Sequence, residues 1–310
     1  MTTDHDEAIL LVGHGSPEEQ ANSQVETIVE AFDQHIDVPV QAAFVEQAHP
    51  AVDEAIISLA DDYDEIVVLP LLLFGAKHVK IDIPLKIEQA RKEITGATVR
   101  YGSHLGVHAG MIDLVANRIA VAESELEADR ISDEIAVVFC PKGSSDPDAN
   151  ADTYKFARLL YEGREFTTVN PAFLTMTDPV LDDVLHMTAN QSPDAIIVVP
   201  YMFGDGVLTE RIRNQADDFT AEYSDIEVTT TNVVGSDVDL IDVLIDRWKE
   251  ARGDAVSMSC DTCQYRMTLA DLETEVGGKD ALIQAIEHQH AHDHDHGHSH
   301  DHSHGHTHSH

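Results

Sequence analysis

The chain contains one internal duplication, and this feature restricts its fold more than any other. Three short stretches of the first half return in the second half, in the same order and 128 to 130 positions later. Ala21-Asn22 returns as Ala149-Asn150. Ala43-Phe44, with Pro50, returns as Ala172-Phe173, with Pro179. Ile66–Pro70, with Phe74-Gly75, returns as Ile196–Pro200, with Phe203-Gly204. A conserved order at a nearly constant offset indicates that one structural unit occurs twice.

Each copy alternates short apolar runs with segments of helical apolar spacing, which predicts a doubly wound, mostly parallel α/β sheet. In the first copy we expect strands at 8–12, 38–45, 66–73 and 97–101, and helices at 17–35, 50–60, 83–93 and 107–126. The second copy begins again with a strand at 135–139. The predicted domains are therefore 1–127 and 128–252, followed by an extension at 253–287 and a histidine-rich tail at 288–310 that lacks the apolar residues to build a core.

Three potentially reactive residues follow consecutive predicted strands of the first copy. His14 lies between two glycines after the first strand, Glu46 ends the second, and His78 is expected in a loop after the third. Open parallel sheets bind ligands at this carboxyl edge. The aligned positions of the second copy hold different residues, namely Lys142, Thr175 and Val207. Because the copies share scaffold residues but not these three, we predict a single active centre in the first copy. A structural role for the histidines is the alternative.

Composition limits the partners. With 57 acidic and 19 basic residues, a formal charge of −38 and a pI of about 4.5, the chain is not expected to bind nucleic acid or anionic membranes. An acidic surface of this size suits a halophilic cytoplasm, where salt screens self-repulsion, although a merely acidic protein is the simpler interpretation. We expect a cytoplasmic protein, because there is no apolar run of roughly 18 residues and no signal-peptide core. Three cysteines do not make a disulfide framework.

One local exception to this acidity is the window 77–92, which has five basic and two acidic residues. A small polyanion is the simplest partner for such a patch.

For the candidate site, neutral imidazole both ligates borderline divalent metals and accepts protons near neutral pH. His14 and His78 are therefore predicted to be transient metal ligands and proton acceptors, with Glu46 as a third ligand or as the carboxylate that orients an imidazole.

Four motifs together make the chain resemble the class II tetrapyrrole chelatases, specifically the long sirohydrochlorin cobaltochelatases of the CbiX type. They are LLVGHGS at 10–16, AFVEQAHP at 43–50, LPLLLFGAKHVKIDIP at 69–84 and KGSSDPDAN at 142–150. The resemblance implies a metal-inserting lyase that places cobalt(II) in sirohydrochlorin during anaerobic cobalamin synthesis, with release of two protons. No nucleotide is expected, since no Walker motif appears, and the chain is expected to be a monomer or homodimer.

The resemblance also implies a substrate with eight carboxylates. Lys77, Lys80 and Lys86 are the predicted cations for some of them, and Ser16 with the amides around Gly15 for another. A solvated helix face is the alternative for the lysines. Two other functions stay open: the same fold could insert ferrous iron for siroheme or nickel, or the chain could be a metal-storage or chaperone protein that works through its tail.

The carboxyl-terminal additions carry two further predictions. Cys260 and Cys263 form a single C-x-x-C, which the resemblance associates with an iron–sulfur centre. A cluster normally needs four ligands, so no cofactor, zinc or a redox pair are the alternatives. The stretch 288–310 holds twelve histidines interleaved with Asp, Ser and Gly. We expect it to collect or buffer cobalt or nickel, with an affinity tag as the mundane alternative.

Overall fold

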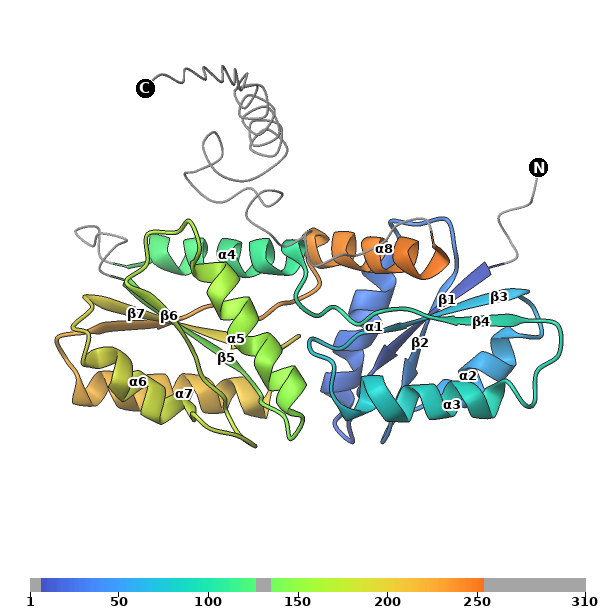
Figure 1. The fold of residues 1–310 in the computed structure, drawn as a ribbon, viewed down its shortest axis with the longest axis horizontal. Coiled ribbons are helices and arrows are strands. Elements are labelled where there is room, and N and C mark those ends of the chain that lie inside the picture. Colours follow the sequence, from blue (N-terminus) through green and yellow to red (C-terminus); the bar gives the residue numbers. More distant parts are fainter. Residues whose placement is uncertain (1–6, 127–134, 254–310) are drawn as a thin grey trace, which may run out of the picture. The chain divides into compact units, whose positions relative to one another are not determined.

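The computed structural model describes residues 7–126 and 135–253, which contain two parallel four-stranded sheets flanked by helices (Figure 1). The first sheet has the order β2-β1-β3-β4 and the second β6-β5-β7-β8, with every pair parallel. The strands are β1 (Glu7–Gly13), β2 (Val40–Phe44), β3 (Glu65–Pro70), β4 (Thr98–Tyr101), β5 (Ile135–Pro141), β6 (Thr168–Pro171), β7 (Ala195–Tyr201) and β8 (Glu227–Thr230). The predicted fold class is confirmed.

The helices follow the strands in the expected alternation. They are α1 (Glu19–Asp33), α2 (Val52–Leu59), α3 (Ile83–Ala90), α4 (Ala109–Ser124), α5 (Pro147–Tyr161), α6 (Leu181–Ala189), α7 (Val207–Glu222) and α8 (Val238–Arg252). Among the described helices none is both long and apolar enough to cross a bilayer. The C-x-x-C pair and the histidine-rich tail lie outside the described residues.

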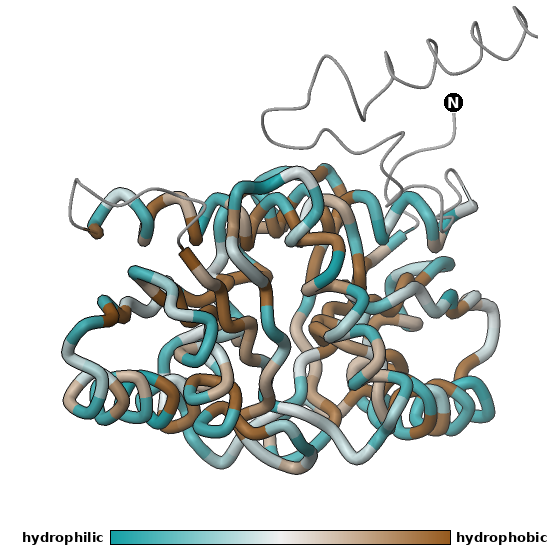
Figure 2. Tube along the Cα trace, turned by 60° about the vertical axis from the view of Figure 1, so that its left-hand side comes forward, coloured by the Kyte–Doolittle hydropathy of each residue, from teal (hydrophilic) through white to brown (hydrophobic). Residues whose placement is uncertain are grey.

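The apolar core explains the strand sequences. The central strands β1 and β5 are covered on both faces, so their side chains are apolar in succession rather than alternately. Residues 8–12 of β1 are at most 1% exposed. Figure 2 shows the hydrophobic residues concentrated along the interior strands, while the outer helices mix hydrophobic and hydrophilic positions.

The two copies exchange their last helices. Helix α4 ends the first copy but packs on β7 and α5, whereas α8 ends the second copy and packs on β3 and β4 (Figure 1). From α8, the buried Arg247 donates to the carbonyl of Leu105 at 2.6 Å, and Trp248 Nε1 donates to Glu7 Oε1 at 2.7 Å. The boundary expected near residue 127 therefore separates the repeats along the chain but does not separate the packed units.

The predicted loop that carries His78 is in fact helical. Residues His78–Asp82 form one π-helical turn, η1, that continues into α3, and the N–H of Ile83 donates to the carbonyl of His78. Pro84 lies in the first turn of α3 and has no N–H to donate to the carbonyl of Lys80. A wider turn before this proline keeps its ring clear of that carbonyl, which gives a physical reason for the π geometry.

Candidate active site

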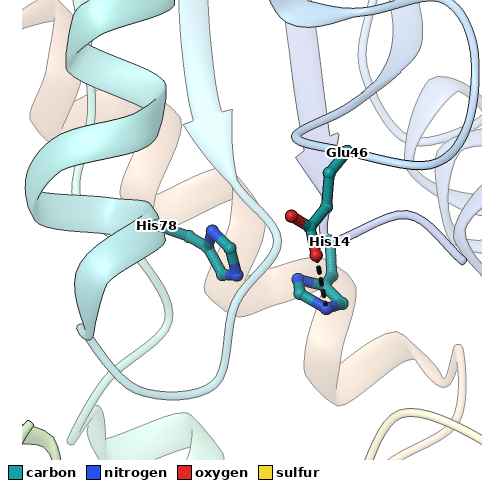
Figure 3. Close-up of side chains that lie close together, drawn as sticks. All are labelled: His14, Glu46 and His78. Atoms are coloured by element: carbon teal, nitrogen blue, oxygen red, sulfur yellow. Dashed lines mark ion pairs between the residues drawn. The ribbon is translucent and has the colours of Figure 1, made fainter. Parts of the chain in front are cut away.

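The site residues follow three adjacent strands of the first sheet. β1 lies between β2 and β3, with Gly13 opposite Phe44 and Val12 opposite Pro70. The segments after these strands therefore leave the same edge of the sheet side by side. They carry His14, Glu46 and His78, whose side chains point toward one another in Figure 3.

The three side chains lie within the reach of one ion. His14 Nε2 is 3.7 Å from Glu46 Oε1, and the two imidazole rings are 4.6 Å apart between centroids with an angle of 57° between their planes. One ligand atom from each residue can be chosen so that all three lie within 4.8 Å of one another, and no other such group of three or more occurs among the described residues. Two ligands at about 2.1 Å from one metal are roughly 3.0–4.2 Å apart for angles between about 90° and 180° at the metal, so small side-chain movements suffice to bind one ion.

His78 is held by a carboxylate that the sequence pattern did not single out. Asp82 Oδ2 accepts from His78 Nδ1 at 2.7 Å, across the π-helical turn. A proton on Nδ1, donated to this carboxylate, fixes the orientation of the ring and leaves the lone pair of Nε2 free for a metal or a proton. The spacing of four residues between His78 and Asp82 is the signal that could have revealed this pair, but only once the segment is known to be helical.

The surroundings of His14 favour its neutral form. Partial burial is the largest cause that lowers its pKa below the ordinary value, and the nearby His78 lowers it further, while Glu46 acts in the opposite direction. Lys142 also lowers the pKa of His14. This lysine occupies the position of His14 in the second copy, so the charge of the second copy reaches the site.

Gly15 joins the His14 segment to the Glu46 segment. Its φ is +87°, and a Cβ at this position would overlap the carbonyl oxygen of Glu46. The N–H of Glu46 in turn donates to the carbonyl of His14 at 3.1 Å. Only glycine permits this approach, so the backbone fixes the distance between the first two site residues.

Ser16, a predicted substrate contact, makes the same contacts as its counterpart in the second copy. Its N–H donates to Asn22 Oδ1 at 2.9 Å, and its Oγ accepts from the N–H of Glu18 at 3.1 Å. Ser144 makes the equivalent bonds to Asn150 and Asp146. These shared contacts belong to the scaffold, and substrate binding by Ser16 stays a prediction.

The three predicted substrate-binding lysines all contact carboxylates of the protein. Lys86 Nζ lies 2.8 Å from Asp53 of α2, and Lys77 Nζ lies 3.6 Å from Asp82. Lys80 Nζ contacts Asp146 at 2.7 Å and Asp148 at 2.8 Å, both at the start of α5 in the second copy. Lys77 is the most exposed of the three, at 71%. Substrate contact by these lysines stays a prediction.

Comparison with known proteins points to one family. The profile of the CbiX family matches residues 8–122 and again 136–251. The sirohydrochlorin cobaltochelatase of Priestia megaterium is 30% identical over 265 residues, covering 85% of this chain and 86% of that protein. The sirohydrochlorin ferrochelatase of the same organism is 29% identical over 221 residues, covering 71% of this chain and 81% of that protein. The structure described as SirB from Bacillus subtilis with Fe3+ aligns with a TM-score of 0.71 and 26% identity, covering 79% of this chain and 95% of that chain.

Proposed function

The chain belongs to the CbiX family, and from this premise we propose that it inserts a divalent metal, cobalt(II), into sirohydrochlorin. The observation that carries the proposal is the group of His14, Glu46 and His78 at the carboxyl edge of the first sheet. Two imidazoles and one carboxylate suit a borderline divalent ion that must be held and then released.

The chemistry assigns each of the three side chains a task. The Nε2 atoms of His14 and His78, with a carboxylate oxygen of Glu46, hold the incoming ion after it loses water. As the pyrrolic nitrogens replace these ligands, two N–H bonds of the macrocycle break. The freed imidazoles accept the protons and pass them to solvent, so that one divalent ion replaces two protons. Asp82 accepts from His78 Nδ1, which orients the imidazole and leaves Nε2 as the nitrogen that faces the ion.

Cobalt is proposed over iron on two grounds. The cobaltochelatase relative aligns with 85% of this chain and the ferrochelatase relative with 71%, at nearly equal identity. The twelve histidines of the tail suit cobalt or nickel, which imidazole binds more tightly than ferrous iron. The donor set of the site follows the same affinity order, but it accepts all three ions and so does not exclude iron. Iron insertion, for siroheme, is the second candidate.

The test is a spectroscopic insertion assay with the full chain. Mixed anaerobically with sirohydrochlorin and cobalt(II), the protein is expected to change the absorption spectrum of the macrocycle, and parallel assays with iron and nickel rank the metals. His14→Ala and His78→Ala should each lower the rate at least about 100-fold. His35→Ala, which removes an exposed imidazole that is hydrogen-bonded to the carbonyl of Ala31, is the matched control and should keep the wild-type rate.

Two results would contradict the proposal. Near wild-type insertion by His14→Ala or His78→Ala would remove these residues from the site. Metal binding without any change in the macrocycle spectrum would instead favour a storage or chaperone protein.

Two further parts of the proposal are a salt-rich cytoplasm as the place of work and an iron–sulfur cluster as a cofactor. The charge of −38 supports work in a salt-rich cytoplasm, and greater stability in molar potassium chloride than in dilute buffer would test this. An iron–sulfur cluster at Cys260 and Cys263 would need ligands from elsewhere, because the remaining cysteine, Cys140, is fully buried in β5. Visible absorbance of the anaerobically purified protein tests for the cluster.

A further inference from the structure

The segment that carries His78 is held by the second copy at two points. Phe74 lies against two aromatic rings of that copy, with centroids 6.3 Å from Phe156 and 5.3 Å from Tyr201. Six residues further on, Lys80 Nζ contacts carboxylate oxygens of Asp146 and Asp148. His78 lies between these two attachments. Its place relative to His14 therefore depends on contacts made by the copy that lacks the reactive residues.

The two carboxylates that receive Lys80 have different supports. Asp146 is the N-cap of α5: its Oδ1 accepts from the N–H of Asp148 at 3.0 Å, and its Oδ2 receives Lys80. This side chain is 22% exposed and fixed to the helix end. Asp148, in the first turn of α5, is 75% exposed. Together they use two of the three N–H donors of the ammonium group.

The duplication supplies an internal control for this contact. In the second copy the position of Lys80 is held by Thr209, whose hydroxyl bonds to the backbone of Gly206 instead of reaching the other copy. The positions of Asp146 and Asp148 are held in the first copy by Glu18 and Gln20. Within the described residues, the corresponding contact of the other side is a neutral hydrogen bond from Gln24 Nε2 of α1 to the carbonyl of Asp205, so the ion pair occurs only on the side of the reactive histidine.

We propose that Lys80, Asp146 and Asp148 form a clamp between the two copies that positions His78 for metal binding. The clamp rests on the proposed function of the site and deepens it. Lys80 and His78 belong to the same π-helical turn, so a displacement of Lys80 moves the imidazole as well. The second copy then contributes to metal transfer as a positioning element. Lys80 acts in this way through His78 rather than by receiving a carboxylate of the tetrapyrrole.

A double-mutant cycle in the full chain tests the clamp. Its members are Lys80→Met, the double variant Asp146→Asn/Asp148→Asn, and their combination. Asparagine caps a helix as well as aspartate does, so α5 keeps its N-cap. Each member should lower kcat about tenfold, as loss of a group that orients a metal ligand does, with less than a twofold change in the KM for sirohydrochlorin. The combination should be no worse than either change alone, and Lys80→Arg should restore most of the rate.

Cobalt(II) binding gives a second measurement that needs no tetrapyrrole. The visible absorption of cobalt(II), taken as the difference from a His14→Ala/His78→Ala variant of the full chain, removes the contribution of the histidine-rich tail. The clamp predicts about tenfold weaker binding to the site in Lys80→Met and in the aspartate variant alike. Cobalt(II) binding is measured without insertion, so it tests the clamp separately from the proposed function. Each of the two proposals can be refuted while the other one holds.

Changes of opposite sign in the KM for sirohydrochlorin, in Lys80→Met and in the aspartate variant, would overturn the proposal. If Lys80 received a substrate carboxylate, Lys80→Met would raise the KM for sirohydrochlorin, and the aspartate variant, which frees the lysine, would lower it. Additive losses in the combination, or wild-type cobalt binding in either variant, would equally exclude a clamp.

Discussion

Gly15 offers the sharpest test of how the scaffold builds the site, because the second copy contains the same backbone feature without the reactive side chains. Gly15 has a φ of +87° and Gly143 a φ of +90°. A Cβ at Gly15 would overlap the carbonyl oxygen of Glu46, and one at Gly143 would overlap that of Thr175. Replacing each glycine by alanine therefore imposes nearly the same perturbation in both copies.

The expected cost in stability is similar for the two variants. A side chain in the left-handed region costs about 1–2 kcal/mol. Relief of the overlap separates the two segments and weakens one backbone hydrogen bond, from Glu46 to His14 or from Thr175 to Lys142, worth about 0.5–1.5 kcal/mol. The free energy of unfolding should fall by about 1.5–3.5 kcal/mol in each variant, which corresponds to a drop in Tm of roughly 3–14 °C.

The expected costs in activity differ. In Gly15→Ala the movement separates His14 from Glu46, and a displacement of about 1 Å at reacting groups can cost roughly 100-fold in rate. Gly143→Ala leaves those groups in place, so we expect a loss of no more than about threefold. Thermal unfolding and cobalt insertion, the latter measured well below both melting temperatures, provide the comparison. Equal activity losses in the two variants would show that destabilisation alone explains them, and full activity in Gly15→Ala would refute the positioning role.

Three further predictions concern other parts of the chain. Burial, then the charges of Arg247 and Lys80, lower the pKa of His104 from 6.5 to about 4, so the unfolded chain binds more protons between these values. Relative to His104→Gln, the wild type should therefore lose up to about 3 kcal/mol of unfolding free energy as the pH falls from 6.5 to 4. Denaturant titration at each pH measures this loss, and parallel curves of unfolding free energy against pH for the two proteins would refute it. Burial raises the pKa of the Cys140 thiol to about 12, so this thiol should not react in the native protein. A thiol reagent should label at most the other two cysteines of the native chain, and it should label Cys140 only after unfolding. Removal of residues 288–310 should leave the insertion rate unchanged at saturating cobalt and lower it when cobalt is scarce; equal loss at both concentrations would argue against a buffering role.

The sequence predicted those features of the fold that depend on local pattern and on the duplication. Apolar runs marked the strands, and the residues that follow three of them meet because β1 lies between β2 and β3. The contrast between copies directed attention to His14, Glu46 and His78, which the structure brings together. Their catalytic roles stay predictions.

Other features depend on contacts that local pattern does not encode. Helices α4 and α8 each present an apolar face, but this pattern does not tell which of two similar sheets the face will cover. The basic window suggested lysines free for substrate, yet Lys80 finds carboxylates 66 and 68 residues away. In a chain with 57 acidic residues, a local excess of positive charge does not reveal which cations are already paired.

The contacts between the two copies give a physical reason for a second copy that lacks the reactive residues. Helix α8 covers β3 and β4 of the first sheet, and the proposed clamp rests on α5, so loss of the second copy would uncover that sheet and remove the clamp. A second metal-binding group would bring no matching gain, since one tetrapyrrole accepts one ion and a second group would compete for scarce metal. Lys142 at the position of His14 instead provides a positive charge, which helps to keep His14 neutral and suits a substrate with many carboxylates. The second copy accordingly has the scaffold contacts of Gly143 and Asn150, whereas its residues at the three ligand positions differ.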